Sequence, residues 1–356
     1  MKKYLVTIAA GAALCLTAGA AMAGPTLDLV KKNGFIRCGV NPSLIGFAAT
    51  NDAGEYQGFD VDYCKAVASA VFNDPSKVKY TPLNAKERFT ALQSGEIDML
   101  ARNSTWTMSR DTQMGIMFTG VNYYDGQGFM VRKSQNISSA LELNGATVCV
   151  QTGTTTELNL ADYFKANKMD YTLVAFENNT DVNNAYDAGR CDALTTDASG
   201  LYATRLALQK PDDHIVLPEI ISKEPLGPVV RQGDDEWFGL VKWVGFALVN
   251  AEELGITKEN VEQMKATALD DQAQLAKDPS YKAKGSPDAA RLLGVDGTFG
   301  QSIGLGNDWA FNVIKQMGNY GEIFDRNIGA GSKLQIARGL NALWSKGGIQ
   351  YAPPIR

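Results

Sequence analysis

Histidine is almost absent from this sequence of 356 residues, which contains only His214. Nucleophilic catalysis of the Ser-His-Asp or Cys-His type needs a base beside the nucleophile, and this histidine follows the loop-like stretch Pro211-Asp212-Asp213. No histidine–carboxylate cluster that would suit zinc is apparent, and the sequence has neither a P-loop nor a G-x-G-x-x-G motif. It therefore predicts no catalytic residue, no metal site and no cofactor.

Clusters of basic residues are also missing. Lysine and arginine together number 34 against 39 aspartates and glutamates, which gives a formal net charge of −5. Surfaces that bind nucleic acid gather lysine and arginine on one face. Nucleic acid is therefore not an expected partner.

Only one long apolar run is present, at residues 4–20. Two lysines precede it and Ala21-Met22-Ala23 follows it, which is the pattern of a secretory signal peptide with an A-x-A cleavage site. A membrane anchor is the alternative, but small residues dilute the end of the run, which is near the minimum length for a span. We expect residues 1–23 to be a signal peptide. The remaining 356 − 23 = 333 residues are expected to form a soluble protein of two domains.

The cysteines form no C-x-x-C pair, which argues against a zinc ribbon or a redox motif. Cys15 lies within the predicted signal peptide. The other four, Cys38, Cys64, Cys149 and Cys191, predict two disulfides in an oxidising compartment, for which three connectivities are possible.

Strands and helices alternate in the first hundred residues after the predicted signal peptide. Apolar runs indicate strands at residues 35–40, 77–82 and 97–100, and helical spacing indicates helices from residue 60 onward and at residues 87–94. Such alternation is typical of an α/β fold with a largely parallel sheet.

The helix that begins near Asp60 carries a first cysteine on its inward face. Val61, Cys64 and Val71 recur at helical spacing, and Asp60 is expected to cap the helix. Because Cys38 lies on a strand that this helix could cover, we predict the disulfide Cys38–Cys64.

Residues 91–100 and 185–194 repeat one pattern, 94 residues apart. Each consists of a helix end, a glycine, one charged residue and x-Asp-x-Leu entering a strand. Cys149 lies on a strand predicted at residues 146–150, and Cys191 begins another. Neighbouring strands would bring these cysteines together, so we predict the disulfide Cys149–Cys191 and two similar lobes.

Two extended segments, residues 126–132 and 224–231, lead away from the first lobe and back to it. Two crossings predict a two-strand hinge. Helical stretches are expected near residues 309–317 and 334–344 of a C-terminal extension. The predicted organisation is residues 24–132 for the first part of lobe one, 133–223 for lobe two, 224–275 for the return to lobe one, and 276–356 for an extension packed on the lobes.

Polar donors follow the strand predicted at residues 97–100. Open α/β sheets bind ligands beyond the carboxyl ends of their strands, and Arg102, Asn103, Thr105 and Arg110 follow this strand end. The planar fork of Arg110 suits a carboxylate. The alternative is an ordinary loop with surface arginines.

The corresponding segment of lobe two is equally polar. Gln151, Thr154 and Thr155 lie at the start of a predicted helix, whose free amides would attract a carboxylate. Thr154 and Glu157 also fit a simple capping box, which is the alternative. Asp197 follows the second repeat at a strand end, where it could pair with an ammonium group or cap the next helix.

Taken together, these groups match one kind of ligand. An arginine and a helix start suit a carboxylate, and an aspartate suits an ammonium group. Buried charges are costly unless they are paired. A site that supplies both partners would select zwitterions, and a free amino acid is the expected ligand.

Several short motifs occur together in this order: Gly58-Phe59-Asp60-Val61-Asp62, Ser94-Gly95-Glu96-Ile97-Asp98, Asn103-Ser104-Thr105-Trp106-Thr107, Thr107-x-x-Arg110, Gln151-Thr152-Gly153-Thr154-Thr155, Ala188-Gly189-Arg190-Cys191-Asp192-Ala193, Gly318-Asn319-Tyr320-Gly321-Glu322, Arg338-Gly339-Leu340-Asn341 and Tyr351-Ala352-Pro353-Pro354. These motifs resemble those of the polar amino-acid-binding proteins of bacterial ABC importers, solute-binding protein family 3, over about residues 27–254. The motifs of the longer C-terminus resemble those of a branch of this family that binds L-amino acids in general.

The resemblance implies a type II periplasmic-binding-protein fold, in which two α/β lobes are joined by a two-strand hinge. It implies that Arg110 binds the ligand α-carboxylate, helped by Thr105 and the amide of Thr155, and that Asp197 binds the α-ammonium. It further implies a periplasmic, monomeric protein that delivers L-amino acids to the membrane permease subunits of an ABC transporter.

Departures from the family pattern bear on specificity. Leu44 and Ala85 stand where the family often has an aromatic residue, and Asn41 stands where a carboxylate recognises cationic side chains. These residues favour a tolerant pocket and broad specificity. We hypothesise that Arg102 faces the ligand side chain and favours acidic or amide side chains, the alternative being a surface salt bridge.

Two other functions remain compatible with the same fold. A periplasmic dehydratase of small carboxylates would need a general acid in the cleft, such as a glutamate, whereas the donor loops offer arginine, threonine and asparagine. A sensor that hands the amino acid to a receptor would use the same binding residues as a transport protein.

Overall fold

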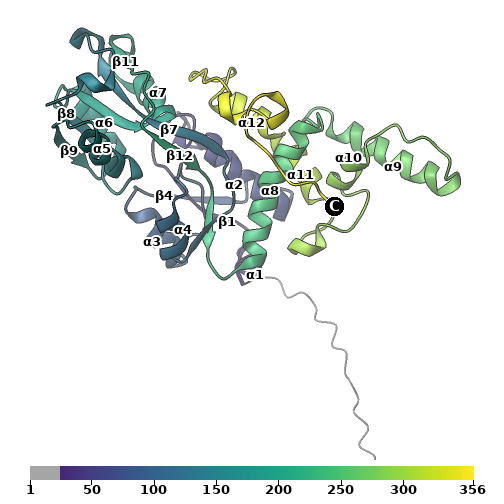
Figure 1. Cartoon of the computed structure of the whole chain (residues 1–356). Helices are drawn as coiled ribbons and strands as arrows, with labels where there is room; N and C mark the ends of the chain where they lie inside the picture. The colour runs from purple at the N-terminus through teal and green to yellow at the C-terminus, as the bar shows by residue number, and fades with distance from the viewer. Residues whose placement is uncertain (1–24) are drawn as a thin grey trace, which may run out of the picture.

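The computed structural model describes residues 25–356, and the signal peptide expected at residues 1–23 lies outside the described residues. Two mixed sheets with helices packed around them form the described part (Figure 1). Between residues 25 and 356, no helix combines the length and apolar character that crossing a membrane requires. The architecture is the predicted α/β fold.

The first sheet has five strands in the order β4-β1-β5-β13-β6. Its strands are β1 (Ile36–Val40), β4 (Val78–Pro82), β5 (Met99–Leu100), β6 (Ile116–Phe118) and β13 (Val229–Arg231). The same part of the chain contains the helices α1 (Pro25–Asn33), α2 (Phe59–Phe72), α3 (Glu87–Gln93), α4 (Met108–Gln113) and α8 (Asp235–Glu253), and a separate hairpin of β2 (Ala49–Thr50) and β3 (Tyr56–Gln57). β1 pairs in parallel with β4 and β5, as predicted, whereas β13 pairs antiparallel with β5 and β6. The antiparallel strand is the one that returns from the second sheet.

The second sheet has the order β11-β7-β10-β8-β9, and β12 also pairs with β7. Its strands are β7 (Tyr123–Arg132), β8 (Thr147–Gln151), β9 (Thr172–Phe176), β10 (Ala193–Asp197), β11 (His214–Val216) and β12 (Ser222–Leu226). The helices between these strands are α5 (Thr155–Ala166), α6 (Asn179–Asp187) and α7 (Ala198–Ala207). β8, β9 and β10 are parallel, and β7 runs antiparallel to β10. Each sheet therefore has a parallel part whose strands end at one edge.

The repeated sequence pattern makes the same hydrogen bonds in both sheets. Asp98 accepts a hydrogen bond from the backbone amide of Arg37 in β1 at 2.8 Å, and Asp192 accepts one from the amide of Thr147 in β8 at 2.8 Å. The glycine three positions before each aspartate is left-handed, with φ of 79° and 80°, which glycine adopts without a steric cost. The two repeats thus attach equivalent strands to one another.

Each of the two sheets has one disulfide that starts from a parallel strand, but the two disulfides end on different kinds of element. Cys38 on β1 is bonded to Cys64 on α2, with the Cα atoms 6.4 Å apart. Cys149 on β8 is bonded to Cys191, just before β10, with the Cα atoms 5.7 Å apart. These are the pairs predicted from the helix and strand patterns.

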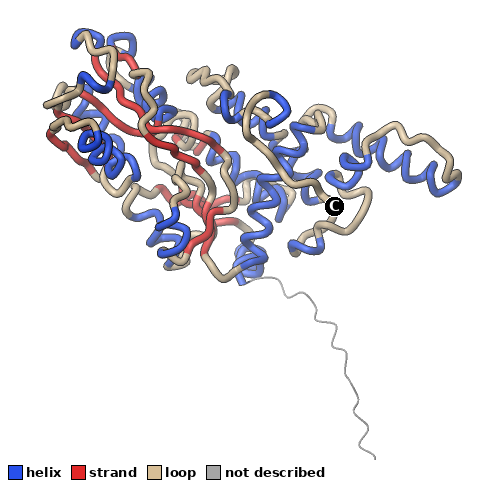
Figure 2. The backbone as a smooth tube through the Cα atoms, in the orientation of Figure 1, coloured by secondary structure: helices blue, strands red, loops and turns tan. Residues whose placement is uncertain are grey.

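Two crossings connect the sheets. The chain leaves the first sheet after β6 and enters β7, and it returns from β12 to β13. β12 pairs with the first half of β7, so the two strands run side by side between the sheets (Figure 2). A Cβ atom on Gly227 would lie 2.0 Å from the carbonyl oxygen of Gly120. The crossings therefore touch at a point that only glycine allows.

The C-terminal part packs on the first sheet's helices. It contains α9 (Val261–Lys277), α10 (Pro287–Leu292), α11 (Trp309–Met317) and α12 (Tyr320–Asn327). α11 contacts α2 and α8, and α9 and α10 lie on the side of α8 away from α5 and α6 (Figure 1). α11 confirms the helix predicted at residues 309–317.

The prediction of a helix at residues 334–344 is wrong. Two single 3₁₀ turns, Gly339–Asn341 and Trp344–Lys346, are the only helical structure there. Gln335 and Gly339 have φ of 51° and 47°, and left-handed residues interrupt a right-handed helix.

This irregular segment instead holds the start of β7. The side-chain oxygen of Asn341 accepts a hydrogen bond from the amide of Tyr124 at 2.7 Å, and its nitrogen donates to the carbonyl of Tyr124 at 3.1 Å. Tyr320 and Gln350 both donate to the carbonyl of Asn122, at 2.8 and 3.3 Å. Side chains of the C-terminal extension thus make hydrogen bonds with backbone groups at the beginning of β7, a hinge strand.

We predict that Asn341→Ala lowers the free energy of unfolding by about 1–3 kcal/mol, because both backbone groups of Tyr124 lose their partner. Urea titration followed by circular dichroism measures the change. Asn184→Ala, at an exposed position of α6, is the control and should change the value by less than about 0.5 kcal/mol. Equal effects of the two substitutions would contradict this role of Asn341.

Candidate functional site

The carboxyl ends of the parallel strands carry the polar residues predicted to bind a ligand. In the first sheet, Asn41 follows β1 and Arg102 lies just beyond β5. In the second sheet, β8 ends just before Thr155, and Asp197 is the last residue of β10. Both edges therefore present side chains of the predicted site.

These two edges face each other and are in contact. The hydroxyl groups of Thr105 and Thr155 lie 3.2 Å apart, and the Lys86 ammonium is 2.7 Å from the carboxylate of Glu177. Ser43 and Thr180 also lie within hydrogen-bond distance, at 3.3 Å. The structure is therefore in a state in which the two strand-end edges meet.

Arg110 lies in α4 with its side chain largely buried. One guanidinium nitrogen donates to the carbonyl of Thr105 at 2.9 Å, and the guanidinium lies 5.1 Å from the centre of the Phe89 ring. The side chain of Thr107 caps α4 by accepting from the Arg110 amide. Burial lowers the pKa of Arg110, while Glu224 and Asp197 raise it. The arginine is thus held by backbone and ring, not by a direct ion pair.

Arg102 is still more deeply buried, with 2% of its surface exposed. Its Nε donates to the carbonyl of Leu83 at 2.9 Å, and its Nη2 has no hydrogen-bond partner. Burial lowers the pKa of Arg102 to about 10. No ion pair of Arg102 occurs among residues 25–356, so the surface salt bridge considered as an alternative is excluded.

Arg88 is a buried arginine that the sequence analysis missed. It donates to the carbonyl of Arg102 at 3.3 Å, and its guanidinium lies 4.8 Å from the centre of the Phe89 ring. Burial, together with Arg102 and Arg110, lowers its pKa well below the usual value. Its position four residues before Leu92, an apolar residue on the same face of the helix predicted at residues 87–94, was the available signal.

Asp197 occupies the N-cap position of α7, but its side chain makes no capping hydrogen bond. The capping role considered as an alternative is therefore not observed. Burial raises the pKa of Asp197 well above its usual value, as do Asp125 and Glu224, while Arg88 and Arg110 lower it. Asp197 is thus a buried acid at the edge that faces the arginines.

Glu224 was also missed, and it joins the two edges at the hinge. Its Oε2 accepts hydrogen bonds from Thr105 at 2.6 Å and Thr155 at 2.8 Å, and its Oε1 accepts from Asn159 and Ser222, both at 2.7 Å. A buried carboxyl group with four donors is well satisfied. Glu224 lies in β12, the hinge strand that returns to the first sheet. The sequence predicted only an extended segment there and gave no sign that this carboxylate would be buried.

Gln151 and Thr154 have their side chains engaged within the second sheet's own edge. Thr154 donates to the carbonyl of Gln151 at 2.6 Å and accepts from the amide of Glu157 at 3.1 Å. Gln151 donates to the carbonyl of Glu177 at 2.8 Å. Thr154 therefore caps α5, and of the threonines predicted here it is Thr155 that reaches the opposite edge.

Asn103 is held next to Asp60, for which the structure corrects the predicted role. Gly58 is at the N-cap of α2, and Asp60 lies inside the helix, where it accepts from the Asn103 amide at 2.8 Å. The Asn103 side chain accepts from Asn41 at 3.1 Å. Burial raises the pKa of Asp60 to about 7, against the lowering effects of Asn103 and Arg102.

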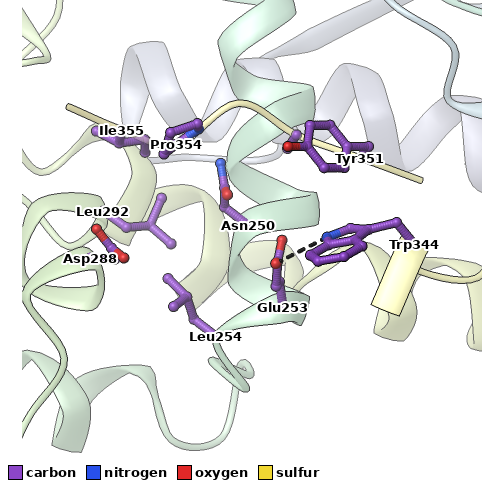
Figure 3. A pocket seen from close by; sticks show the side chains of 10 residues that line it. Asn250, Glu253, Leu254, Asp288, Leu292, Trp344, Tyr351, Pro354 and Ile355 are labelled. Carbon is purple, nitrogen blue, oxygen red and sulfur yellow. Dashed lines mark hydrogen bonds between the residues drawn. The ribbon is translucent and has the colours of Figure 1, made fainter. Parts of the chain in front are cut away.

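A separate pocket, drawn in Figure 3, has a volume of about 230 Å³. α8, α10 and the C-terminal segment line it, and Trp344 donates to Glu253 at 3.1 Å across one side. None of the residues predicted to bind a ligand lines this pocket.

Comparisons with known proteins match the whole chain. The family of bacterial extracellular solute-binding proteins, family 3, matches residues 36–275. The general L-amino acid-binding periplasmic protein AapJ of Rhizobium johnstonii is 62% identical over 358 residues, covering 100% of both chains. The glutamate/glutamine/aspartate/asparagine-binding protein BztA of Rhodobacter capsulatus is 56% identical over 341 residues, covering 96% of each. A solved structure of an ABC transporter periplasmic binding protein from Brucella ovis, with glutathione bound, has a TM-score of 0.86 at 60% identity, covering 93% of this chain and 99% of that one.

We predict that Asp60 makes the ligand-free protein less stable as pH rises. Between the usual carboxyl pKa near 4 and the folded value of about 7, the folded protein holds a proton that the unfolded chain releases. The free energy of unfolding therefore falls by up to about 1.4 kcal/mol per pH unit in this window. Urea titrations across the window should show that Asp60→Asn, whose oxygen can still accept from the Asn103 amide, removes this contribution.

The control is Asp52→Asn, because Asp52 is exposed. The difference in free energy of unfolding between Asp52→Asn and the wild type should be the same across this pH window. If the difference between Asp60→Asn and the wild type is also the same at every pH, the buried-acid account of Asp60 is wrong.

Proposed function

The chain belongs to the bacterial extracellular solute-binding proteins, family 3, and we propose that it is the periplasmic substrate-binding component of an ABC importer for L-amino acids, with broad specificity. Relatives that match it over nearly their whole length are described as binding L-amino acids in general, or glutamate, glutamine, aspartate and asparagine. Its partners would be an L-amino acid and the permease subunits of the transporter. It would act as a monomer, exported through the signal peptide expected at residues 1–23.

The opposed charges of Arg110 and Asp197 carry this proposal. Both side chains are at least nine-tenths buried, each influences the pKa of the other, and yet they form no ion pair within the described chain. An α-carboxylate on Arg110 and an α-ammonium on Asp197 would give each its missing partner. Binding a zwitterion would therefore remove two uncompensated buried charges at once.

The carboxylate would be held by more than Arg110. The first amides of α5 have no partner within the helix, so the Thr155 amide can donate to the ligand. The hydroxyl groups of Thr105 and Thr155 are engaged with Glu224. We therefore assign these hydroxyl groups to bracing the two lobes, and the direct contact with the ligand to Arg110 and the amide.

Closure of the lobes would couple binding to transport. Hinge bending at β7 and β12 would separate the edges, and a ligand that contacts both edges favours the closed state. Closure also removes water, which strengthens each charged contact. The permease would then distinguish the closed, loaded protein from the open one.

Neither alternative function gains support from a specific contact. A dehydratase needs a general acid free to act in the cleft. Glu224, which touches both edges, accepts four hydrogen bonds, from Thr105, Thr155, Asn159 and Ser222. A sensor would use the same residues as a transport protein, so gene context distinguishes these two roles.

We predict that the mature, ligand-stripped protein binds several chemically different L-amino acids, and that Arg110→Ala weakens all of them at least about 30-fold. Truncating one partner of a buried charge pair costs about 2–5 kcal/mol, which corresponds to this loss. Calorimetric titration measures the affinities. Arg190→Ala, at an exposed arginine, is the control and should bind as the wild type does. Retained tight binding by Arg110→Ala would refute the carboxylate assignment.

A further inference from the structure

Three arginines lie together at the first edge, and one of them has an unused donor. Arg88 and Arg110 both lie against the Phe89 ring, and Arg88 donates to the carbonyl of Arg102. Arg102 is 2% exposed, and its Nη2 has no partner. A buried charged donor without a partner is costly, which makes this atom a position where an oxygen acceptor would bind.

The backbone fixes the orientation of Arg102. Its Nε donates to the carbonyl of Leu83, which follows β4, and its own carbonyl accepts from Arg88. A guanidinium has five donors in a rigid plane, so anchoring Nε also sets where Nη2 lies. Arg102 is therefore positioned before any ligand arrives.

The acids nearby do not satisfy this donor. Asp60 and Asp197 are the two that attract Arg102, but neither forms an ion pair with it. Asp60 instead accepts from the Asn103 amide, and Glu224 is occupied by its four donors. The first edge thus has an excess of buried positive charge that one α-carboxylate, bound by Arg110, would not use up.

We propose that Arg102 forms a second anion subsite, positioned by Arg88, that binds the side-chain oxygen of the ligand. This inference rests on the proposed function, because it assumes that Arg110 and Asp197 hold the amino-acid backbone. The subsite selects L-amino acids whose side chain ends in a carboxylate or carboxamide over aliphatic amino acids of the same length. The protein would then bind many L-amino acids with graded affinity, and glutamate, glutamine, aspartate and asparagine would bind more tightly than aliphatic amino acids.

The test compares L-glutamate with L-norvaline, whose side chain has the same number of carbons but ends in a methyl group where glutamate has its carboxylate. Calorimetric titration of the wild type should show glutamate bound at least 100-fold more tightly. Arg102→Met, which keeps an unbranched chain without donors, should reduce this ratio at least tenfold. Arg102→Lys should restore part of it, because it keeps the charge but loses the planar fork.

The outcomes separate this inference from the proposed function. If the wild type binds neither ligand, nor any other L-amino acid, the proposed function fails. If the wild type binds both ligands with similar affinity, the function stands and the subsite is refuted, whether or not the variants fold. If Arg102→Met weakens both ligands by the same factor, Arg102 supports the site in general and does not read the side chain.

Discussion

Uncompensated buried charge at the meeting point of two sheets is the constraint on which the rest of this structure depends. Arg88, Arg102 and Arg110 lie on one side and Asp197 on the other, all largely buried and without a direct ion pair between them. Such an arrangement is expensive in a folded protein. A ligand with a carboxylate and an ammonium group, as proposed above, would supply the missing partners of Arg110 and Asp197.

The fold creates this arrangement by bringing parallel strand ends to one place. β1, β4 and β5 end at one edge, β8 and β10 at the other, and β7 and β12 carry the chain between them. Glu224 on the returning strand binds a threonine from each edge. The C-terminal segment holds the start of β7 through Asn341. The hinge is therefore braced from both sides, close to the site it would open.

Local sequence patterns predicted the strand ends, both disulfides and the repeat built around Asp98 and Asp192, because these depend on short-range periodicity and turn glycines. Arg88, Asp60 and Glu224 were not predicted as parts of the site. Each is a charged residue buried by contacts with distant segments, whereas a sequence alone suggests a solvated surface for charged residues.

The C-terminal segment is a second case in which contacts with distant residues were not predictable from the sequence. Its apolar spacing near residues 334–344 suggested a helix, but the segment is irregular and instead donates and accepts hydrogen bonds at β7. Tertiary hydrogen bonds to a hinge strand leave no periodic signal in the sequence. Long-range partners, not local preferences, decided the conformation here.

A crystal structure of the mature protein with L-glutamate tests the central claim most directly. The account predicts the α-carboxylate on the Arg110 guanidinium and the α-ammonium about 3 Å from the Asp197 carboxylate, between the two strand-end edges. A ligand bound elsewhere, or one whose ammonium group lies away from Asp197, would contradict it.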